Sequence, residues 1–391
     1  MIFAFYEFFA GGGMARLGLG RRWQCTFAND WDKTKAKVYR ANFRGAPELL
    51  VKDVRGVQMS DLPDAPILAW ASFPCQDLSL AGNRAGLDAE RSGTFWPFWR
   101  LMEDMATEGR ALPLIVIENV AGLLTSNGGQ DFALLLKTFL QAGYRGGALV
   151  IDAVRFVPQS RSRLFLVMVR EDIDILARLV SPAPDPIWHP ENVRAAYMLL
   201  EKNCRSKLVW WRLPAPPPRH LGLSDLVEDE PTGVSWHSQE ETARLLKMMS
   251  AINLRKVEEA KSGSLFQPRQ KRVVGTIYKR IRKGVQRAEV RFDDVSGCLR
   301  TPVGGSSRQT IIIVEGQHIR TRLLSPREAT RLMGIPDSYT LPESYNDAYH
   351  LAGDGVVVPV VAHLERHLLR TLAKALREKT APHQENVVEA A

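Results

Sequence analysis

A cysteine follows a short apolar run early in the chain. Residues 67–71 read Ile-Leu-Ala-Trp-Ala, and the polar loop after them contains Cys75, Gln76 and Ser79. The run predicts a buried strand, and ligands of open α/β sheets bind above the carboxyl ends of such strands. A thiol at that point is a candidate nucleophile. The alternative is a small buried hydrophobic residue, which is the usual role of a lone free cysteine.

Two further groups of charged residues flank predicted strands. One apolar strand ends in Glu118, and a carboxyl group among apolar residues tends to have a raised pKa and can hold or donate a proton. The alternative is a structural acid that caps the following helix. Elsewhere the chain has polar or charged side chains at every second position, namely Gln159, Arg161 and Arg163. In a strand this spacing places all three on the same side. Two guanidinium groups on one side are costly unless anions bind them. Together with Cys75, these residues combine a thiolate, a proton donor and anion contacts, a set suited to attack on an electron-poor ring.

A nucleoside pocket is predicted near the amino terminus. The apolar segment 2–9 leads into the glycines at 11–13, where the backbone can turn tightly and let a ligand approach. Asp30 follows at the tip of the next predicted strand, where a carboxylate can accept hydrogen bonds from ribose hydroxyls. The adjacent Trp31 could stack on an adenine ring. At this level both a nicotinamide cofactor and S-adenosylmethionine are compatible with the pattern.

The elements that must position these residues alternate between strands and helices over the first 170 residues. Helices are predicted over 33–43 and 131–142. The predicted strands are 2–9, 23–29, 66–71, 114–118, 148–154 and 164–169. Such alternation is typical of βαβ units, so the sequence predicts an α/β fold with a doubly wound parallel sheet.

The rest of the chain is less regular. Residues 181–218 are rich in proline and tryptophan and predict irregular structure. Ser238 and Glu241 form a predicted capping box that opens a helix through about Glu259. We expect the apolar face of this helix to pack in the hydrophobic core. The face consists of Leu245, Leu246, Met249 and Ile252. Ser325 and Glu328 form a second predicted capping box, and a last helix is predicted from about 356 to 376.

Composition narrows the class of protein. The chain has 391 residues, 45% hydrophobic and 24% charged, enough for two globular domains. No apolar run is long enough to cross a membrane and no secretory signal is visible, so we expect a cytoplasmic protein. Four widely spaced cysteines predict reduced thiols and no metal. The formal charge is +9, and between Lys261 and Arg291 ten basic residues accompany one acid, which favours a polyanionic partner over a merely solvated face.

In their order along the chain, these motifs resemble those of the DNA cytosine-5 methyltransferases. The resemblance covers most of the chain outside about 175–317. It is carried by residues 8–13, 29–32, 52–54, 73–76, 118–120, 159–163, 322–328 and 332–337. It implies a doubly wound, Rossmann-like, S-adenosylmethionine-dependent methyltransferase domain and a smaller, irregular target-recognition domain. The implied division is 1–175 catalytic, 176–317 target recognition, 318–379 catalytic again, and 380–391 a polar tail.

The resemblance also implies a mechanism. Cys75 would add to carbon 6 of a cytosine flipped out of double-stranded DNA, with Glu118 acting at ring nitrogen 3. S-adenosylmethionine would then methylate carbon 5, leaving S-adenosylhomocysteine. Arg163 would hold the carbonyl oxygen of the base, and Arg161 a nearby phosphate. The implied cofactor contacts are Phe9, Gly11, Gly13, Asp30, Trp31, Asp53, Val54 and Pro74. The candidate DNA contacts in the catalytic part are Gln76 and Ser79, and those in the basic run are Lys271, Arg272, Lys279 and Arg280. Arg308 and Gln309 are of the types that pair with guanine and adenine edges, but a glycine turn between two strands is an equal alternative for residues 304–309.

Four positions depart from the family pattern. Glu7 stands where an aspartate is usual, and Met14 replaces a common glycine. Ala81 takes the place of a small polar residue that often occupies the space left by the flipped base. Asp354 stands where the family usually has an asparagine that contacts the methionine moiety of the cofactor.

The sequence supports three alternative functions less well. The tRNA cytosine-5 methyltransferases share the motif order, but a recognition region as long as 176–317 favours DNA. A catalytically silent relative would not need Cys75, Glu118 and Arg163 together. Methyltransferases of exocyclic amino groups carry a Pro-Pro-Tyr-type motif where this chain has Pro74 and Cys75. We further expect a monomer from a restriction-modification or phage-defence system, with a restriction endonuclease as a possible partner.

Overall fold

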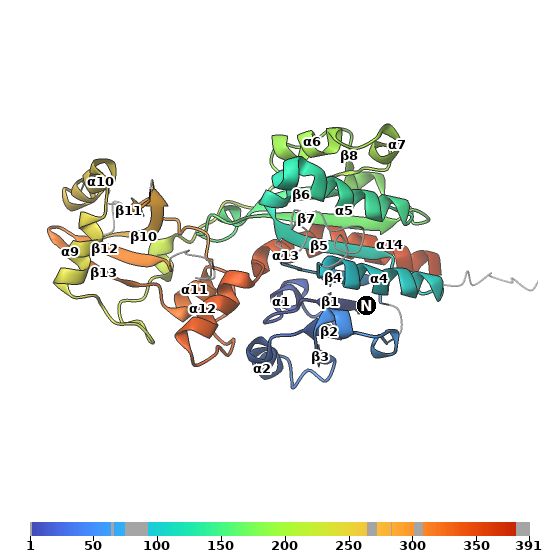
Figure 1. The fold of residues 1–391 in the computed structure, drawn as a ribbon, viewed down its shortest axis with the longest axis horizontal. Coiled ribbons are helices and arrows are strands. Elements are labelled where there is room, and N and C mark those ends of the chain that lie inside the picture. Colours follow the sequence, from blue (N-terminus) through green and yellow to red (C-terminus); the bar gives the residue numbers. More distant parts are fainter. Residues whose placement is uncertain are drawn as a thin grey trace, which may run out of the picture.

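The larger sheet of the molecule has seven strands in the order β3-β2-β1-β4-β5-β7-β6 (Figure 1). The structure is a computed structural model and describes residues 2–63, 66–74, 93–263, 272–282, 284–300 and 308–380. The strands are β1 (Phe3–Phe8), β2 (Trp23–Asp30), β3 (Leu49–Val51), β4 (Leu68–Ala71), β5 (Leu114–Val120), β6 (Tyr144–Asp152) and β7 (Ser162–Arg170). Strands β1 to β5 pair in parallel, whereas β7 is antiparallel to β5 and β6. The carboxyl ends of the parallel strands and the start of β7 therefore share one edge of the sheet, called here the strand-tip edge.

Helices cover both faces of this sheet. Phe3 and Phe5 of β1 belong to one core, which includes α1 (Met14–Leu19), α13 (Val358–Leu364) and α14 (Arg370–Thr380). Tyr6 and Phe8 belong to the other, which includes α4 (Phe95–Thr107) and α5 (Gln130–Gln141). A parallel sheet buried on both faces explains why its strands read as continuous apolar runs.

The sequence-based prediction of a doubly wound α/β fold is confirmed. All six predicted strands belong to the sheet, with ends shifted by a few residues. The three residues of β3 were missed because so short a strand shows no period. The predicted helix 33–43 is α2 (Lys33–Asn42), capped by the side chain of Asp32. The last predicted helix is α13 and α14, joined by a π-helical turn at Glu365–Leu369.

A second, antiparallel sheet lies at the far end of the molecule from α14 (Figure 1). Its strand order is β11-β10-β12-β13. The strands are β10 (Val273–Arg282), β11 (Val285–Arg291), β12 (Thr310–Glu315) and β13 (His318–Leu323). It packs against α9 (Gln239–Lys247) and α10 (Ala251–Lys261) through a small core that includes Met249 and Ile277. None of these four strands was assigned from the sequence, although the alternative of a glycine turn between two strands at residues 304–309 allowed for a strand such as β12.

The remaining helices connect or flank the two sheets. They are α6 (Glu191–Met198), α7 (Lys202–Arg205), α8 (Leu223–Leu226), α11 (Pro326–Arg331) and α12 (Tyr345–Asp354). Helices α11 and α12 lie between the sheets (Figure 1). A short two-stranded pair, β8 (Val180–Ser181) and β9 (Trp210–Trp211), completes the fold.

Some contacts bear on the predicted division into domains. Trp188 and Trp211 are buried in the core of the larger sheet, although they lie in the predicted recognition region. Strand β13 pairs with β12 and so belongs to the second sheet, beyond the predicted boundary at 317. The division stays a prediction, and these contacts favour boundaries near Leu213 and Leu323.

One expectation in the recognition region was partly wrong. Both predicted capping boxes form, because the side chains of Ser238 and Ser325 accept from the backbone three residues on. The helix that starts at Ser238, however, breaks into α9 and α10 at residues 248–250. Leu245 and Met249 are buried, but the break rotates Ile252 out of the apolar face, and its side chain is 68% exposed.

Candidate active site

The glycine loop after β1 has one open side. A side chain on Gly12 would approach Leu351 to 2.7 Å, and one on Gly13 would collide with Phe43, so these two glycines allow close packing. Gly11 has a φ of +54° and no atom within 4 Å of the position a side chain would take. It is therefore the glycine that a ligand can approach without obstruction.

An acid and an aromatic ring border that open side. Asp30, at the end of β2, is buried, and its carboxylate accepts from the backbone N–H of Gly11 at 2.7 Å and of Asp32 at 2.8 Å. Burial raises the pKa of Asp30 above its ordinary value. A carboxylate has about four acceptor positions, so lone pairs remain for ribose hydroxyls. Trp31 beside it is 74% exposed, so its indole face is available for stacking.

The other predicted cofactor contacts come from neighbouring strand ends. Asp53 follows β3, and its carboxylate accepts two hydrogen bonds from the Arg55 guanidinium, which holds the pKa of Asp53 below its ordinary value. Val54 is buried, whereas Pro74 after β4 is exposed. Phe9 has a φ of 57°, an uncommon backbone conformation for a residue with a side chain.

The predicted proton donor lies in a dry position at the end of β5. Glu118 is 6% exposed, and its Oε1 lies 3.3 Å from Nε of Arg163 at the start of β7. Burial raises the pKa of Glu118, while the charges of Arg163 and Arg161 and a hydrogen bond from Ser72 oppose the rise. The neutral carboxyl is therefore more populated near neutral pH than in an exposed glutamate.

The neighbouring Asn119 holds the segment that leads to Cys75. Its Nδ2 donates to the carbonyl oxygen of Phe73 at 3.0 Å. Ser72 is held in turn, because Nε1 of Trp70 donates to its hydroxyl at 3.0 Å. Cys75, Gln76, Ser79, Ala81 and Lys271 lie outside the described residues. Asn119 and Ser72 were not singled out from the sequence, because nothing local shows which groups they face.

Arg161 has a different role from the one expected. It is 2% exposed, and its Nη2 donates to the carbonyl oxygens of Gly353 and Gly355, both at 2.7 Å. Its Nη1 donates to the carbonyl oxygen of Leu299 at 2.8 Å. The predicted phosphate contact is corrected, because these backbone oxygens hold the guanidinium inside the protein. Arg161 is a positioning residue that ties β7 to two distant segments.

Gln159, just before β7, also connects distant segments by hydrogen bonds. Its Nε2 donates to the carbonyl oxygen of Leu332 at 2.8 Å, and its Oε1 accepts from the backbone N–H of Leu299 at 3.1 Å. The amide is fully buried. The strand-tip edge is therefore joined by side-chain hydrogen bonds to the end of the recognition region and to the returning part of the chain.

Glu7 is a buried acid of β1 that hydrogen-bonds to α1, the helix after the glycine loop. Glu7 accepts from the backbone N–H of Arg16 at 3.1 Å and from the Tyr39 hydroxyl at 2.9 Å. Burial is the main reason that the pKa of Glu7 rises to about 7. Glu7 stands where the family usually has an aspartate, and its carboxyl group links β1, α1 and α2 by hydrogen bonds.

The predicted DNA contacts divide into two groups. Arg280 is half exposed on β10, lies over the ring of Tyr278, and is paired in register with Arg287 of β11. Lys279 precedes it on the same strand, and Arg272 forms an ion pair with Asp229. Arg280 also forms an ion pair with Glu289, with Nε 3.8 Å from Oε2.

The second group is turned inward. Gln309 is only 5% exposed, so the predicted contact of its side chain with a base edge is corrected. Arg308 lies against α12, where it contacts Asn346 and the ring of Tyr345.

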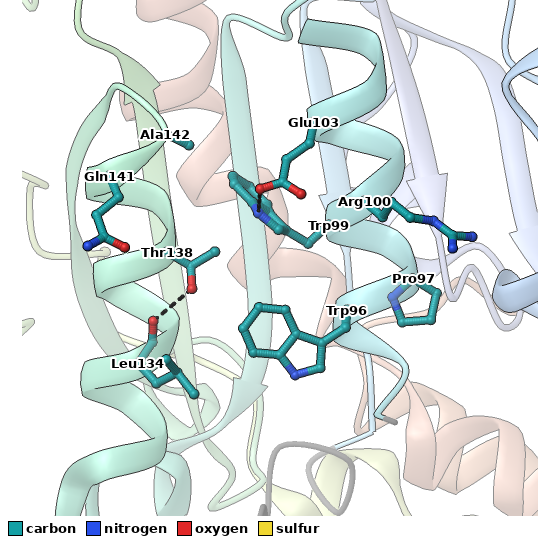
Figure 2. A pocket seen from close by; sticks show the side chains of 9 residues that line it. All are labelled: Trp96, Pro97, Trp99, Arg100, Glu103, Leu134, Thr138, Gln141 and Ala142. Atoms are coloured by element: carbon teal, nitrogen blue, oxygen red, sulfur yellow. Dashed lines mark hydrogen bonds between the residues drawn. The ribbon is translucent and has the colours of Figure 1, made fainter. Parts of the chain in front are cut away.

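A separate cleft of about 560 Å³ opens between α4 and α5 (Figure 2). It lies on a helical face of the larger sheet and contains no predicted site residue. Its lining residues are Trp96, Pro97, Trp99, Arg100, Glu103, Leu134, Thr138, Gln141 and Ala142. We therefore do not assign it to the cofactor.

Two kinds of feature are absent from the described ranges. No group of three or more His, Cys, Asp or Glu side chains there could hold a metal ion. No helix in the same part of the chain is long and apolar enough to cross a membrane.

Comparison with solved structures defines the class of fold. The structure of the Dnmt2 methyltransferase of S. pombe is similar, with a TM-score of 0.56 and 17% sequence identity, over 96% of this chain and 99% of that chain. A DNMT2 mutant of Spodoptera frugiperda gives a TM-score of 0.57 at 16% identity, over 95% and 99% of the two chains. The fold is therefore that of a methyltransferase.

Sequence comparison defines the family. The model of the C-5 cytosine-specific DNA methylase family matches residues 3–370. Type II methyltransferase M.Bsp6I of Bacillus sp. (strain RFL6) is 25% identical over 372 residues, covering 93% of this chain and 98% of the relative. M.HhaI of Haemophilus parahaemolyticus is 26% identical over 362 residues, covering 92% of each. The chain belongs to the C-5 cytosine-specific DNA methylase family and is a DNA cytosine-5 methyltransferase of the type II bacterial kind.

Proposed function

We propose that this enzyme methylates carbon 5 of a cytosine flipped out of double-stranded DNA, with Cys75 as a transient nucleophile. The observation that carries the proposal is the buried pair of Glu118 and Arg163 at the strand-tip edge. Asn119, next to Glu118, holds the carbonyl of Phe73, two residues before Cys75. A proton donor and an anion contact thus lie beside the segment that carries the thiol.

In the proposed reaction, the sulfur of Cys75 bonds to carbon 6 of the cytosine. Glu118 donates a proton or a hydrogen bond to ring nitrogen 3, so the electron pair of the 5,6 double bond becomes available at carbon 5. S-adenosylmethionine supplies an electrophilic methyl group on its sulfonium sulfur. After carbon 5 has been methylated, loss of its proton restores the double bond and expels the Cys75 thiolate. Arg163 holds the carbonyl oxygen of the base.

The cofactor pocket of this proposal is the open side of the glycine loop. The unobstructed approach at Gly11, the remaining acceptor positions of Asp30 and the uncovered Trp31 suit a nucleoside. Membership of a methyltransferase family implies S-adenosylmethionine rather than a nicotinamide cofactor. The proposed contacts, in full, are Phe9, Gly11, Gly13, Asp30, Trp31, Asp53, Val54 and Pro74.

For DNA, the proposal relies on the hairpin of β10 and β11. Arg280 and Arg287 lie directly opposite each other, so their like charges repel. The carboxylate of Glu289, 3.8 Å from Nε of Arg280, offsets part of this positive charge. A DNA phosphate between them would relieve the repulsion. Lys279 and Arg272 extend the same basic surface, and Gln76, Ser79 and Lys271 remain proposed contacts from the sequence alone.

The relatives reported above are named type II methyltransferases. These names support the proposal that the enzyme acts in a restriction-modification system with a cognate endonuclease. The proposal also includes a cytoplasmic monomer, which rests on the sequence alone. Bisulfite sequencing of cells that express the enzyme would give the target sequence. DNA methylated at that sequence should then resist the partner nuclease, and unprotected DNA should be cut.

Transfer of a radioactive methyl group tests the activity itself. The purified enzyme should label duplex DNA, and nucleoside analysis should find the label in 5-methyl-2′-deoxycytidine. Cys75→Ser should abolish labelling while the protein still binds S-adenosylhomocysteine. Labelling of tRNA in place of DNA would contradict the proposal, as would full activity of the Cys75→Ser variant.

A further inference from the structure

A second cavity, called here the basic pocket, lies where three separate segments of the chain meet. Its volume is about 400 Å³, and it is lined by the turn after β6, by residues 216–221 and by α13 with the π-helical turn after it. The turn after β6 lies at the strand-tip edge, because Asp152 at the end of β6 pairs with Ser162 at the start of β7. The basic pocket therefore borders the edge where we place the target base. None of the described residues that line it is a predicted site residue.

Three arginines give this pocket its charge. Arg155 and Arg366 are exposed, and Arg219 lies between them in burial as a partly exposed residue. The described residues that line the pocket include no aspartate or glutamate. Like charges that converge on a cavity without a carboxylate favour a bound anion.

The acids nearest in sequence to Arg155 and Arg366 have other partners. Asp152 accepts from the backbone N–H of Arg161 at 2.9 Å. Glu365 accepts from Nε of Arg370 at 2.8 Å. Neither carboxylate is therefore committed to the arginines of the basic pocket.

The walls between the charges are apolar and hold one arginine in place. Phe156 and Leu221 line the pocket together with three consecutive prolines, 216–218, whose rings fix the backbone. Nε of Arg219 donates to the carbonyl oxygen of Val154 at 3.3 Å, and its Nη1 donates to that of Leu221. The N–H groups on Nη2 of Arg219 are left for a ligand. Apolar walls around charges of one sign concentrate the electric potential in the cavity.

A neutral histidine ties the segments of the pocket together. Nε2 of His363, on α13, donates to the carbonyl oxygen of Pro214 at 3.0 Å. Burial, followed by the charges of His367 and Arg366, lowers the pKa of His363 to about 4. His363 is therefore uncharged near neutral pH and acts as a structural contact, whereas the arginines supply the positive charge.

We propose that the basic pocket binds a phosphate group through Arg155, Arg219 and Arg366. Guanidinium groups bind phosphate through paired, charge-assisted hydrogen bonds. Two sources supply this chemistry, the backbone of DNA and free phosphate. The position of the pocket beside the strand-tip edge favours a backbone phosphate outside the target base pair, an assignment that rests on the proposed DNA substrate. A phosphate held there also connects the larger sheet with the segment that leads into the recognition region.

The variants Arg366→Gln and Arg219→Gln remove one charge each. Arg366 makes no hydrogen bond within the described part of the chain, so its variant should melt near the wild-type temperature. Arg219→Gln also removes the bonds to Val154 and Leu221, so agreement between the two variants separates charge from folding. Arg212→Gln, an exposed arginine outside the pocket, is the matched control.

One arm of the test uses DNA. In cognate duplexes, one backbone phosphate at a time is replaced by an uncharged methylphosphonate, and binding is measured by fluorescence anisotropy. At the position that meets the pocket, the replacement should weaken wild-type binding about fivefold. Both pocket variants should bind the unmodified duplex about fivefold more weakly and respond to that replacement by less than about twofold. Arg212→Gln should respond as the wild type does.

The other arm uses inorganic phosphate and the full-length protein without DNA. Calorimetric titration should show a saturable site in the wild type, with an affinity about tenfold lower in each pocket variant and unchanged in Arg212→Gln. Loss of the methylphosphonate response in the pocket variants identifies DNA as the source of the phosphate. Phosphate binding that depends on the pocket, without any such response, identifies free phosphate.

The inference is overturned if neither arm separates the pocket variants from Arg212→Gln. It is also overturned if Arg219→Gln loses binding only together with its fold while Arg366→Gln binds DNA and phosphate as the wild type does. A wild-type protein that does not methylate DNA would contradict the proposed function instead, and the inorganic phosphate arm would still test the pocket.

Discussion

The strand-tip edge of the larger sheet and the hairpin of β10 and β11 hold their charges in opposite ways. At the edge, Arg161 and Glu118 are buried. Arg161 donates to backbone carbonyl oxygens, and Glu118 forms an ion pair with Arg163. On the hairpin, Arg280 and Arg287 lie exposed and opposite one another. The edge is therefore assembled before any substrate arrives, which suits chemistry that must be identical at each turnover. The hairpin keeps these arginines at the surface, where a polyanion can reach them, which suits a region that selects among DNA sequences.

The largest effect is expected at the edge, for Glu118→Gln. The amide keeps the shape of the side chain but cannot transfer a proton to ring nitrogen 3. Single-turnover methyl transfer should fall about 100-fold or more, in the range typical of a lost general acid. Binding of S-adenosylhomocysteine should remain within about twofold. A variant with near wild-type rates would remove Glu118 from the proposed mechanism.

Arg161→Ala tests whether the edge is built by buried hydrogen bonds. The change leaves the carbonyls of Gly353, Gly355 and Leu299 without the guanidinium, and the free energy of unfolding should fall by about 3 kcal/mol in urea titrations. Arg155→Ala, at an exposed arginine of the same segment, should change it by less than about 0.5 kcal/mol. Equal effects of the two changes would show that the buried bonds carry no special weight.

The buried carboxyl of Glu7 should make stability depend on pH. Its pKa is about 7 in the folded protein and near the ordinary 4.5 in the unfolded chain. Between these values the folded state binds more protons than the unfolded state, so the free energy of unfolding falls as pH rises through that window. Glu7→Gln cannot ionise and should lack this fall. Urea unfolding from about pH 4.5 to 8 should therefore favour the variant increasingly, whereas parallel profiles would refute the assignment.

The smallest effect is expected on the hairpin. Arg280→Gln with Arg287→Gln should weaken DNA binding by several-fold and reduce the slope of log affinity against log salt by about one per lost phosphate contact. Stability should change by less than about 1 kcal/mol, because the like-charge pair is removed together with the half-exposed ion pair of Arg280 and Glu289. Arg255→Gln, exposed on α10, is the control on the same part of the molecule. An unchanged salt slope would mean that DNA binds elsewhere.

Local signals explain what the sequence could predict. The strands that carry Glu118 and the glycine loop are apolar runs buried on both faces, and both capping boxes depend on residues three apart. Glu118 and the glycine loop were therefore placed correctly on their elements, whereas Cys75 lies outside the described residues. The four strands of the second sheet were missed because their exposed, charged positions dilute the apolar alternation.

What the sequence could not show depends on distant partners. The role of Arg161 follows from carbonyls at Gly353 and Gly355, far along the chain. Nothing near Arg161 in the sequence indicates these contacts. Gln309 was interpreted as a base contact because nothing in its local sequence shows that the fold buries it against Gly297.

The covalent step at Cys75 is the central claim, and a trapped intermediate tests it most directly. Duplex DNA that carries 5-fluorocytosine at the methylation site cannot lose its carbon-5 substituent, so the enzyme should stay attached after methyl transfer. With S-adenosylmethionine present, mass spectrometry should find a wild-type adduct that contains the methylated base on a peptide with Cys75. Absence of the adduct on cognate DNA, or its formation by Cys75→Ala, would contradict the account.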